Sequence, residues 1–381
     1  MSKTRNAGPR SPRILLLSGY DAGSHKRWRE QLVASQPDFD WQVIALPPRY
    51  FRWRIRGNAL SWLDAPELRE PWDLIVATSM VDVAGLRAMH PAVGRVPVLL
   101  YMHENQFAYP DSGEQHASVD PQMVNLYSAL SADRVVFNSE WNRRSFLEGI
   151  DRLLERLPDA VPQGVSRRVY EKSCVLPVPI ADAHFVERHQ GPSRSQLVNR
   201  SRPHLLWNHR WEYDKAPDRL LSILLALKDH GQAFRLSVVG EQFRRQPEAF
   251  ESIRRMFGNC IEHWGFMADQ AAYDQLLQSA DIVMSTALHD FQGLSVLEAM
   301  ASGCLALAPN RLAYPEYVPD EQRYPSLADR PEQEAAAAAN VLVRLLQSQT
   351  SVASVEPWRL SHLQPRYREL LRETMASGRV C

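Results

Sequence analysis

The chain has 381 residues, with 44 basic and 44 acidic side chains that leave no formal net charge, and 45% of its residues are hydrophobic. Single hydrophobic cores stop growing at roughly 250–300 residues, so this length predicts two domains. The composition excludes a largely disordered chain and a strongly basic nucleic-acid-binding domain of the usual kind.

The cysteines and the N-terminus indicate a compartment. The four cysteines, at positions 174, 260, 304 and 381, lie far apart and match no zinc or disulfide spacing, which favours a reducing environment. Residues 1–13 are basic, but the apolar run that follows is only ILLL, too short for a signal peptide or a membrane span. We therefore expect a cytoplasmic protein that does not associate with a membrane.

Short apolar runs alternate with helical patterns through the first half of the chain. Because these runs are apolar on both faces, they predict buried parallel strands. The runs span residues 13–20, 41–47, 73–79, 96–104 and 134–139, with helices expected at 123–130 and 140–157. This rhythm predicts a doubly wound α/β domain over residues 11–180.

A polar stretch over residues 181–202 is expected to link this domain to a second one of the same kind, over residues 203–355. Its predicted strands span 204–209, 235–240, 261–266, 281–286 and 304–309, with helices at 216–229, 269–280 and 294–302. By analogy with other two-domain sheets, residues 356–381 are expected to form a helix, disturbed near Pro365, that crosses back to the first domain. The predicted fold is therefore α/β, with two Rossmann-like domains facing across a cleft.

Ligands of open α/β sheets bind beyond the carboxyl ends of the strands, so the residues after each strand are site candidates. After the first strand, Gly23 permits a tight turn and Ser24 can cap a helix that begins near His25. The first amides of that helix can accept an anion or sugar hydroxyls. A plain structural turn explains the segment equally well, because the pattern G-x-G-x-x-G is absent.

The fourth predicted strand ends in the sequence HENQ, which comprises His103, Glu104, Asn105 and Gln106. Four hydrogen-bonding side chains in a row are costly to bury without a partner, which favours a ligand site over a satisfied core histidine. His103 or Glu104 can handle a proton in such a site.

The second half begins with WNHRWEYDKAP, where Arg210 and Lys215 follow a strand and precede a helix. Both cations can reach one polyphosphate, which we favour because Arg210 lies at the strand end. A solvated ion-pair loop that uses Glu212 and Asp214 is the alternative. Further candidates follow the next strand: Gly240 and Glu241.

The segment HDFQGLSVLEAMASG places two acids eight residues apart, Asp290 and Glu298, around the start of a helix. Gly293 and Leu294 bring that helix N-terminus toward the ligand, where its amides favour phosphate oxygens. Glu298 can accept bonds from both hydroxyls of a ribose diol. Since its neighbours are apolar, we expect its carboxylate to be held by a partner.

The segment RYFRWRIRG alternates arginines with aromatic residues. Such a pattern can contact phosphates and stack on unpaired bases of an RNA loop. An exposed Arg-rich loop around a few packing aromatics is the alternative. The candidate residues are Arg52, Arg54 and Arg56, with Arg143 and Arg144 from a later segment expected to extend the same surface. From that later segment, Asn138 is a further candidate for substrate binding.

The sequence DFQGLSVLE resembles the signature of retaining glycosyltransferases of the GT-B fold, in which two acids are separated by seven residues. The resemblance implies that Asp290 approaches the donor sugar, that the helix start at Gly293 binds phosphate and that Glu298 binds the nucleotide ribose. Arg210 and Lys215 match the diphosphate-binding pair of those enzymes. Asp290 is one methylene shorter than the usual glutamate.

The motifs GSHKRW, LPPRYFRWRIRGNAL, YMHENQFAYP, VVFNSEWNRRSFL, WNHRWEYDKAP and AYPEY, in this order, resemble the tRNA-queuosine α-mannosyltransferases. The resemblance implies retaining transfer of mannose from GDP-mannose to the cyclopentenediol of queuosine in the anticodon loop of aspartate tRNA, with no metal or other cofactor. The residues it implies as catalytic are His103, Glu104 and Asp290.

Two other functions stay open at this point. One is a GT-B enzyme with another nucleotide sugar and a lipid or polysaccharide acceptor. The other is a noncatalytic module that binds tRNA or a nucleotide.

Overall fold

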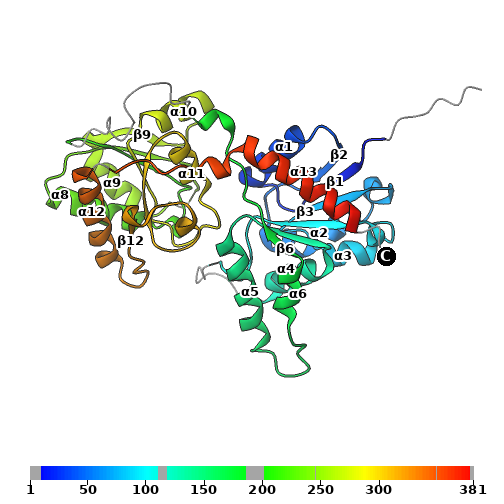
Figure 1. Cartoon of the computed structure of the whole chain (residues 1–381). Helices are drawn as coiled ribbons and strands as arrows, with labels where there is room; N and C mark the ends of the chain where they lie inside the picture. The colour runs from blue at the N-terminus through cyan, green and yellow to red at the C-terminus, as the bar shows by residue number, and fades with distance from the viewer. Residues whose placement is uncertain (1–9, 110–117, 186–200, 245, 349, 378–381) are drawn as a thin grey trace, which may run out of the picture. The chain divides into compact units, whose positions relative to one another are not determined.

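The computed structural model describes residues 10–109, 118–185, 201–244, 246–348 and 350–377. The chain divides into two compact units (Figure 1). The first comprises Met1–Pro177 together with Leu363–Cys381, and the second comprises Val178–His362. Residues 186–200 of the expected connection lie outside the described residues.

The first unit contains a six-stranded, all-parallel sheet in the order β2-β1-β3-β4-β5-β6. This is the flavodoxin-like order, in which the chain changes direction between β1 and β3. The five predicted strands are confirmed as β1 Arg13–Ser18, β2 Asp40–Ala45, β3 Leu74–Thr78, β4 Val98–Met102 and β5 Arg134–Phe137, and the structure adds β6 Ser173–Val175.

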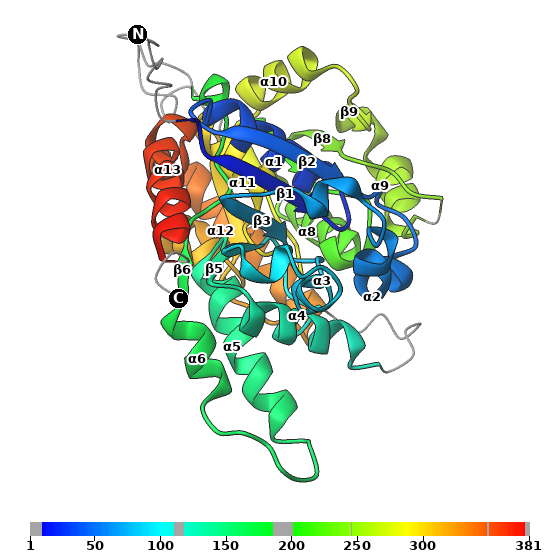
Figure 2. The same ribbon diagram turned by 90° about the vertical axis from the view of Figure 1, so that its right-hand side faces the viewer.

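Helices cover both faces of this sheet, as Figures 1 and 2 show. Their apolar faces meet the fully buried strands β3 and β4, which gives this unit its own hydrophobic core. The helices are α1 Gly23–Ser35, α2 Phe51–Ser61, α3 Val83–Met89, α4 Asp120–Ser131, α5 Glu140–Leu154, α6 Val165–Glu171 and α13 Leu360–Ser377.

The second unit contains a six-stranded parallel sheet in the order β12-β11-β10-β7-β8-β9. This is the Rossmann order, with its change of direction between β7 and β10. The strands are β7 His204–Asn208, β8 Arg235–Val239, β9 Ile261–Gly265, β10 Ile282–Met284, β11 Leu305–Pro309 and β12 Arg323–Tyr324, of which only the two-residue β12 was not predicted.

Within the described residues of the second unit, five α-helices pack around its sheet, and α12 packs against α8. Their bounds are α8 Pro217–Asp229, α9 Ala249–Phe257, α10 Gln270–Ser279, α11 Leu294–Ala301 and α12 Pro331–Gln347. A second hydrophobic core forms between these helices and the buried strands. The two-domain α/β fold expected from the sequence is therefore confirmed.

The last helix, α13, packs on the first unit, beside α1 (Figure 1). The indole Nε1 of Trp28 donates to the hydroxyl of Tyr367 at 3.1 Å, and that hydroxyl lies 3.0 Å from the hydroxyl of Tyr101 on β4. The amide of Gln364 donates to the carbonyl of Ser35 at 2.6 Å. The expected return of the C-terminal helix to the first domain is confirmed, and the helix runs through Pro365.

The Arg-rich segment is not the exposed loop that the alternative interpretation assumed, because residues 51–61 form the helix α2. Ile55, Asn58 and Ala59 are buried at helical spacing and hold α2 on the unit. A side chain at Gly57 would begin 2.7 Å from the ring of Trp53, so the glycine lets this exposed ring lie close against the helix. Because arginine recurs at every second position from 52 to 56, the sequence showed a period of two rather than the period of a helix.

Candidate active site

Lys215 occupies the point where the sheet of the second unit changes direction. It follows β7, and the ammonium donates to the carbonyl of His289, in the loop after β10, at 2.6 Å. The same nitrogen lies 3.4 Å from Oδ2 of Asp290 and 3.3 Å from Oδ2 of Asp214. With its side chain only 9% exposed, Lys215 places a buried positive charge between two carboxylates.

Arg210 lies on the other side of Asp214. Its guanidinium contacts the carboxylate of Glu212 at 2.9 Å and lies 4.0 Å from Oδ2 of Asp214, while half of its side chain is exposed. Although burial opposes ionisation, a hydrogen bond from His289 and the charges of Lys215 and Arg210 lower the pKa of Asp214. The predicted cation pair is thus brought together around one ionised carboxylate.

Asp290 organises the loop that leads into α11. Its Oδ1 accepts a hydrogen bond from the amide of Gly293 at 2.9 Å, while Oδ2 faces Lys215 and the hydroxyl of Tyr314 at 3.4 Å each. Burial opposes its charge, but Lys215, His209 and the Gly293 amide lower the pKa of Asp290. The short aspartate side chain suits this local bond to an amide three residues ahead.

Gly293 caps α11 in a conformation that only glycine adopts easily. Its φ is 76°, and an added Cβ would lie 2.2 Å from the hydroxyl of Tyr317. Leu294 is the first helical residue. The first amides of an α-helix have no intrahelical partner, so the turn that begins at Leu294 presents N–H groups and the positive end of the helix dipole.

Glu298 lies one turn further along α11 and is 4% exposed. The hydroxyl of Tyr273, on α10, donates to its Oε2 at 3.2 Å, which confirms that this carboxylate has a partner. Asn208, at the end of β7, donates to the hydroxyl of Tyr273 at 3.1 Å. The buried Oδ1 of Asn208 has no hydrogen-bond partner among the described residues, so the cluster keeps an acceptor for a ligand.

Gly240 and Glu241 hold the loops after β7 and β8 together through their backbones. A Cβ on Gly240, whose φ is 149°, would lie 1.9 Å from the carbonyl oxygen of His209. The carbonyl of Glu241 accepts from the amide of Trp211 at 2.9 Å, and its side chain is exposed. These two predicted residues therefore shape the site through the main chain.

The imidazole of His209 makes stability sensitive to acid. Burial, and then the charge of Lys215, lower the pKa of His209 to about 4. The unfolded chain then binds more protons as the pH falls from 6.5 toward 4, so stability present above pH 6.5 is lost in this window. The difference between the two pKa values corresponds to at most about 3 kcal/mol.

We expect His209→Gln to flatten the fall of the unfolding free energy between pH 6.5 and 4, measured by denaturant titration at several pH values. His263→Gln, at an exposed histidine of β9, is the matched control and should keep the wild-type slope. Equal slopes for wild type and His209→Gln would contradict the assignment.

Three predicted residues of the first unit, His25, His103 and Glu104, lie together where its sheet changes direction. Nε2 of His25 lies 2.8 Å from Oε2 of Glu104, and its Nδ1 lies 2.9 Å from the carbonyl of Tyr20. The hydroxyl of Ser79, after β3, donates to the other oxygen of Glu104 at 2.7 Å. Burial opposes protonation, but the charge of Glu104 and the hydrogen bond to it outweigh burial and raise the pKa of His25.

His103 stacks on this pair. Its ring lies 4.3 Å from the ring of His25 and 4.7 Å, edge-on, from that of Trp28. Burial, and then the positive charge of His25, lower the pKa of His103 well below its usual value. Its buried Nε2 has no hydrogen-bond partner within the part of the chain that the structure describes. A neutral imidazole of this kind is a weak base but a good hydrogen-bonding group for a hydroxyl.

Asn105 and Asn138, predicted to contact the substrate, are instead fully used inside the unit. The amide of Asn105 donates to Asn142 and Ser145, and its oxygen accepts from two backbone amides. The amide of Asn138 donates to the carbonyl of His103 at 2.8 Å. Asparagine satisfies buried main-chain groups on both sides, so these residues position the HENQ loop.

The other predicted residues of the first unit lie as follows. Gly23 and Ser24 are exposed in the first turn of α1; Ser24 is not the cap, because the helix begins at Gly23. Gln106 is half-buried, Arg52 and Arg56 are exposed and Arg54 is half-buried.

The guanidinium of Arg143 is held by partners on α5 and α6. It is bound to Glu140 at 2.7 Å on its own helix, α5, and lies over the ring of Tyr170 on α6. Sequence analysis expected it to add to the surface around α2, but its partners come from α5 and α6.

Several residues of these clusters were missed because nothing in a single sequence separates them from ordinary core or turn residues. The polar runs WNHRWEYD and ALHDF contain four of them, and the tyrosines at positions 314 and 317 were noted only as part of AYPEY. The residues not proposed for the site are Trp28, Ser79, Asn142, Asn208, His209, Tyr273, His289, Tyr314 and Tyr317, together with Asp214, which was named only in the alternative ion-pair loop.

Three further observations concern the described residues. They contain no group of three or more His, Cys, Asp or Glu side chains arranged to hold a metal ion. No helix among them combines the length and the apolar character needed to cross a bilayer. Cys174, Cys260 and Cys304 are free thiols.

The chain is similar to known proteins over most of its length. The family model described as tRNA-queuosine alpha-mannosyltransferase N-terminal matches residues 13–180, and that of glycosyl transferases group 1 matches residues 202–348. A tRNA-queuosine alpha-mannosyltransferase of Drosophila melanogaster is 32% identical over 316 residues, which cover 82% of this chain and 83% of that protein.

More distant relatives share the fold. A GDP-mannose-dependent alpha-(1-6)-phosphatidylinositol dimannoside mannosyltransferase of Mycobacterium tuberculosis is 27% identical over 65% of this chain and 60% of that protein. Anabaena HepE, solved in complex with UDP and glucose, superposes with a TM-score of 0.60 at 16% identity over 95% of this chain and 100% of that one. Sucrose-phosphate synthase of Thermosynechococcus elongatus gives 0.64 at 15% identity, over 97% and 100%.

The two parallel sheets and the matches above define a glycosyltransferase of the GT-B fold class. It is therefore an enzyme that transfers glycosyl groups. Within that class, the chain belongs to the tRNA-queuosine alpha-mannosyltransferase family.

Proposed function

We propose that this enzyme transfers mannose from GDP-mannose to the cyclopentenediol of queuosine in the anticodon loop of aspartate tRNA. The observation that carries the proposal is the 32% identity, over 82% of the chain, to a tRNA-queuosine alpha-mannosyltransferase. A second relative, which is named GDP-mannose-dependent, supports the choice of donor.

In this proposal the second unit holds the donor. Arg210, half exposed beside Asp214, and Lys215 at the sheet's change of direction supply positive charge to the diphosphate. The amides that begin α11 add hydrogen bonds to the same oxygens. Glu298, oriented by Tyr273, accepts bonds from the ribose hydroxyls.

The chemistry is retaining. The bond between the sugar's anomeric carbon and the diphosphate oxygen breaks, a bond from that carbon to an acceptor oxygen forms on the same face, and the acceptor proton passes to the departing phosphate. Lys215 and Arg210 stabilise the charge that develops on that phosphate. Asp290 keeps Lys215 and the Gly293 amide in place, and its carboxylate faces the sugar.

The first unit supplies the remaining contacts. His103, a neutral imidazole with an unused Nε2, orients a hydroxyl rather than accepting a proton, while the His25–Glu104 pair fixes its ring. Helix α2 exposes Tyr50 and Trp53, at 72% and 49%, beside exposed arginines. Aromatic rings and guanidinium groups suit an anticodon loop with unpaired bases.

The test is a labelling assay with purified enzyme, radiolabelled GDP-mannose and two aspartate tRNAs that differ only in queuosine. We expect mannose on the queuosine-containing tRNA and none on the tRNA with unmodified guanosine. UDP-glucose and UDP-galactose serve as donor controls. Equal labelling of both tRNAs, or transfer only from a UDP-sugar, would overturn the assignment.

We further propose that the reaction needs no metal, since protein cations and helix amides supply the charge that a metal otherwise gives to a diphosphate. Turnover should therefore survive extensive dialysis against EDTA, within about twofold of the untreated enzyme. Loss of turnover that Mg²⁺ or Mn²⁺ restores would contradict this.

A tRNA substrate and three free thiols also support a cytoplasmic location.

A further inference from the structure

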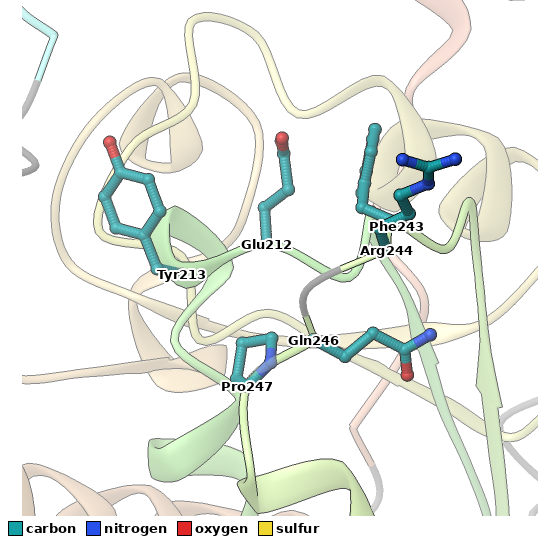
Figure 3. Close-up of a pocket in the computed structure, with 6 residues that line it drawn as sticks. All are labelled: Glu212, Tyr213, Phe243, Arg244, Gln246 and Pro247. Atoms are coloured by element: carbon teal, nitrogen blue, oxygen red, sulfur yellow. The ribbon is translucent and has the colours of Figure 1, made fainter. Parts of the chain in front are cut away.

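A pocket of the second unit remains without a role in the proposal above. It has a volume of about 650 Å³ and opens between the loop after β7 and the loop after β8 (Figure 3). In Figure 3 the side chains of Tyr213, Glu212 and Phe243 stand next to one another and point to the same side, with Arg244 beside Phe243. The lining is completed by Gln246 and Pro247.

Position links this pocket to the donor residues. Glu212 borders it and contacts Arg210 at 2.9 Å, which is the residue proposed for the diphosphate. The residues proposed for the ribose, Glu298 and Tyr273, are not part of its lining. A group bound here therefore lies close to the reacting phosphate without being the ribose.

The lining has the chemistry of a base-binding site. Tyr213, 51% exposed, and Phe243 offer two aromatic rings, and the exposed Arg244 offers a planar cation. Glu212 and Gln246 place an acceptor and an amide at the same opening. Unpaired bases of RNA are bound by stacking on aromatic or guanidinium planes and by hydrogen bonds to their edges. The volume lies within the range of about 300–1,000 Å³ for small-ligand sites.

We propose that this pocket receives an unpaired nucleobase of the RNA acceptor, so that the second unit contacts the RNA as well as the donor. The inference rests on the proposed function. A base seated between Tyr213 and Phe243 holds the loop of the RNA beside Arg210, and it makes this pocket a determinant of which RNA loops are accepted.

The experiment measures binding, not turnover. A fluorescein-labelled anticodon stem-loop that contains queuosine is titrated with Phe243→Ala and Tyr213→Ala, and the Kd for GDP is measured separately by calorimetry. Loss of one base stack is worth about 1–3 kcal/mol, so each variant should raise the Kd for RNA roughly 5- to 150-fold. The Kd for GDP should stay within about twofold of wild type.

Matched controls separate stacking from general damage. Met256→Ala and Arg255→Ala change exposed side chains on the neighbouring α9 and should leave both Kd values unchanged. Phe243→Leu keeps an apolar side chain but loses the ring; it should also weaken RNA binding, and it replaces Phe243→Ala if that variant does not fold.

The outcomes distinguish this inference from the proposed function. Unchanged RNA affinity in folded variants would overturn the pocket assignment, as would a rise in the Kd for GDP alone, which would give the pocket to the donor base. An enzyme that mannosylates the stem-loop but is insensitive to Phe243 would retain its function and lose the pocket. An enzyme whose RNA binding depends on Phe243 but that transfers no mannose would support the pocket assignment and overturn the proposed function.

Discussion

Lys215→Met should reduce kcat/KM for mannose transfer by roughly 10²- to 10³-fold, the usual effect of losing one group that stabilises a developing oxyanion. The ammonium of Lys215 is the buried cation at the change of sheet direction, and it sits between Asp214 and Asp290. Its removal also leaves the buried carboxylate of Asp214 and the partly buried one of Asp290 without their main counter-charge, which should lower the unfolding free energy by about 3–5 kcal/mol.

Both effects are measurable in one preparation. Steady-state kinetics with GDP-mannose, run well below the Tm of the variant, report on catalysis, and calorimetry with GDP reports on donor binding. Lys228→Met removes an exposed lysine of α8 and should match wild type. A folded Lys215→Met enzyme whose kcat/KM lies within about threefold of wild type would remove Lys215 from the diphosphate site.

Gly240→Ala should cause the largest loss of stability, more than about 4 kcal/mol of unfolding free energy. The new Cβ would meet the carbonyl oxygen of His209 at 1.9 Å, and a φ of 149° is itself unfavourable for alanine. Relief requires the ends of β7 and β8 to separate, because both clashing groups belong to the backbone.

Urea denaturation of Gly240→Ala and of a control gives the measurement. Gly258→Ala is the control, since its Cβ meets no atom within 4 Å and its φ is −49°, so it should be neutral or gain up to about 1 kcal/mol. A Gly240→Ala protein that unfolds at the same urea concentration as wild type would show that the two loops are not held in contact.

The sheets could be predicted from the sequence because buried parallel strands carry a signal that is local. Runs such as ILLL and LIVAT are apolar on both faces, and few other environments accept them. The site on the second unit followed from the same fact. Once β7 and β10 were recognised, residues just beyond them, among them Lys215 and Asp290, had to lie near the sheet's change of direction.

The rest depended on partners that are distant in sequence. Nothing in the alternating letters of RYFRWRIRG shows that Ile55 and Ala59 find a core to pack on, so the helix α2 was missed. Asn105 and Asn138 were read as ligand contacts because polar residues after a strand are ambiguous. Only the fold shows that Asn142, on α5, accepts a hydrogen bond from the amide of Asn105 and donates one to the side-chain oxygen of Asn138.

The pocket beside Arg210 was also invisible in the sequence. Tyr213 and Phe243 belong to loops about 30 residues apart, and neither loop alone encloses a volume. Strand pairing between β7 and β8 brings the two rings to one opening. A sequence pattern can predict charged residues at the end of a strand. A cavity between two loops cannot be predicted in this way, because it depends on how the fold places the loops.

The position of α13 has a consequence for how the protein is made. Residues 363–377 follow the whole second unit in the chain and are synthesised after it, yet they complete the unit that begins near residue 10. The hydroxyl of Tyr367, which bonds with Trp28 and Tyr101 beneath the stacked histidines, is thus absent while the whole second unit is being synthesised. A chain truncated before Tyr367 would lack this hydroxyl, so a premature stop codon within the segment that encodes α13 would remove a buried hydrogen-bond partner of Tyr101, which lies 266 residues earlier.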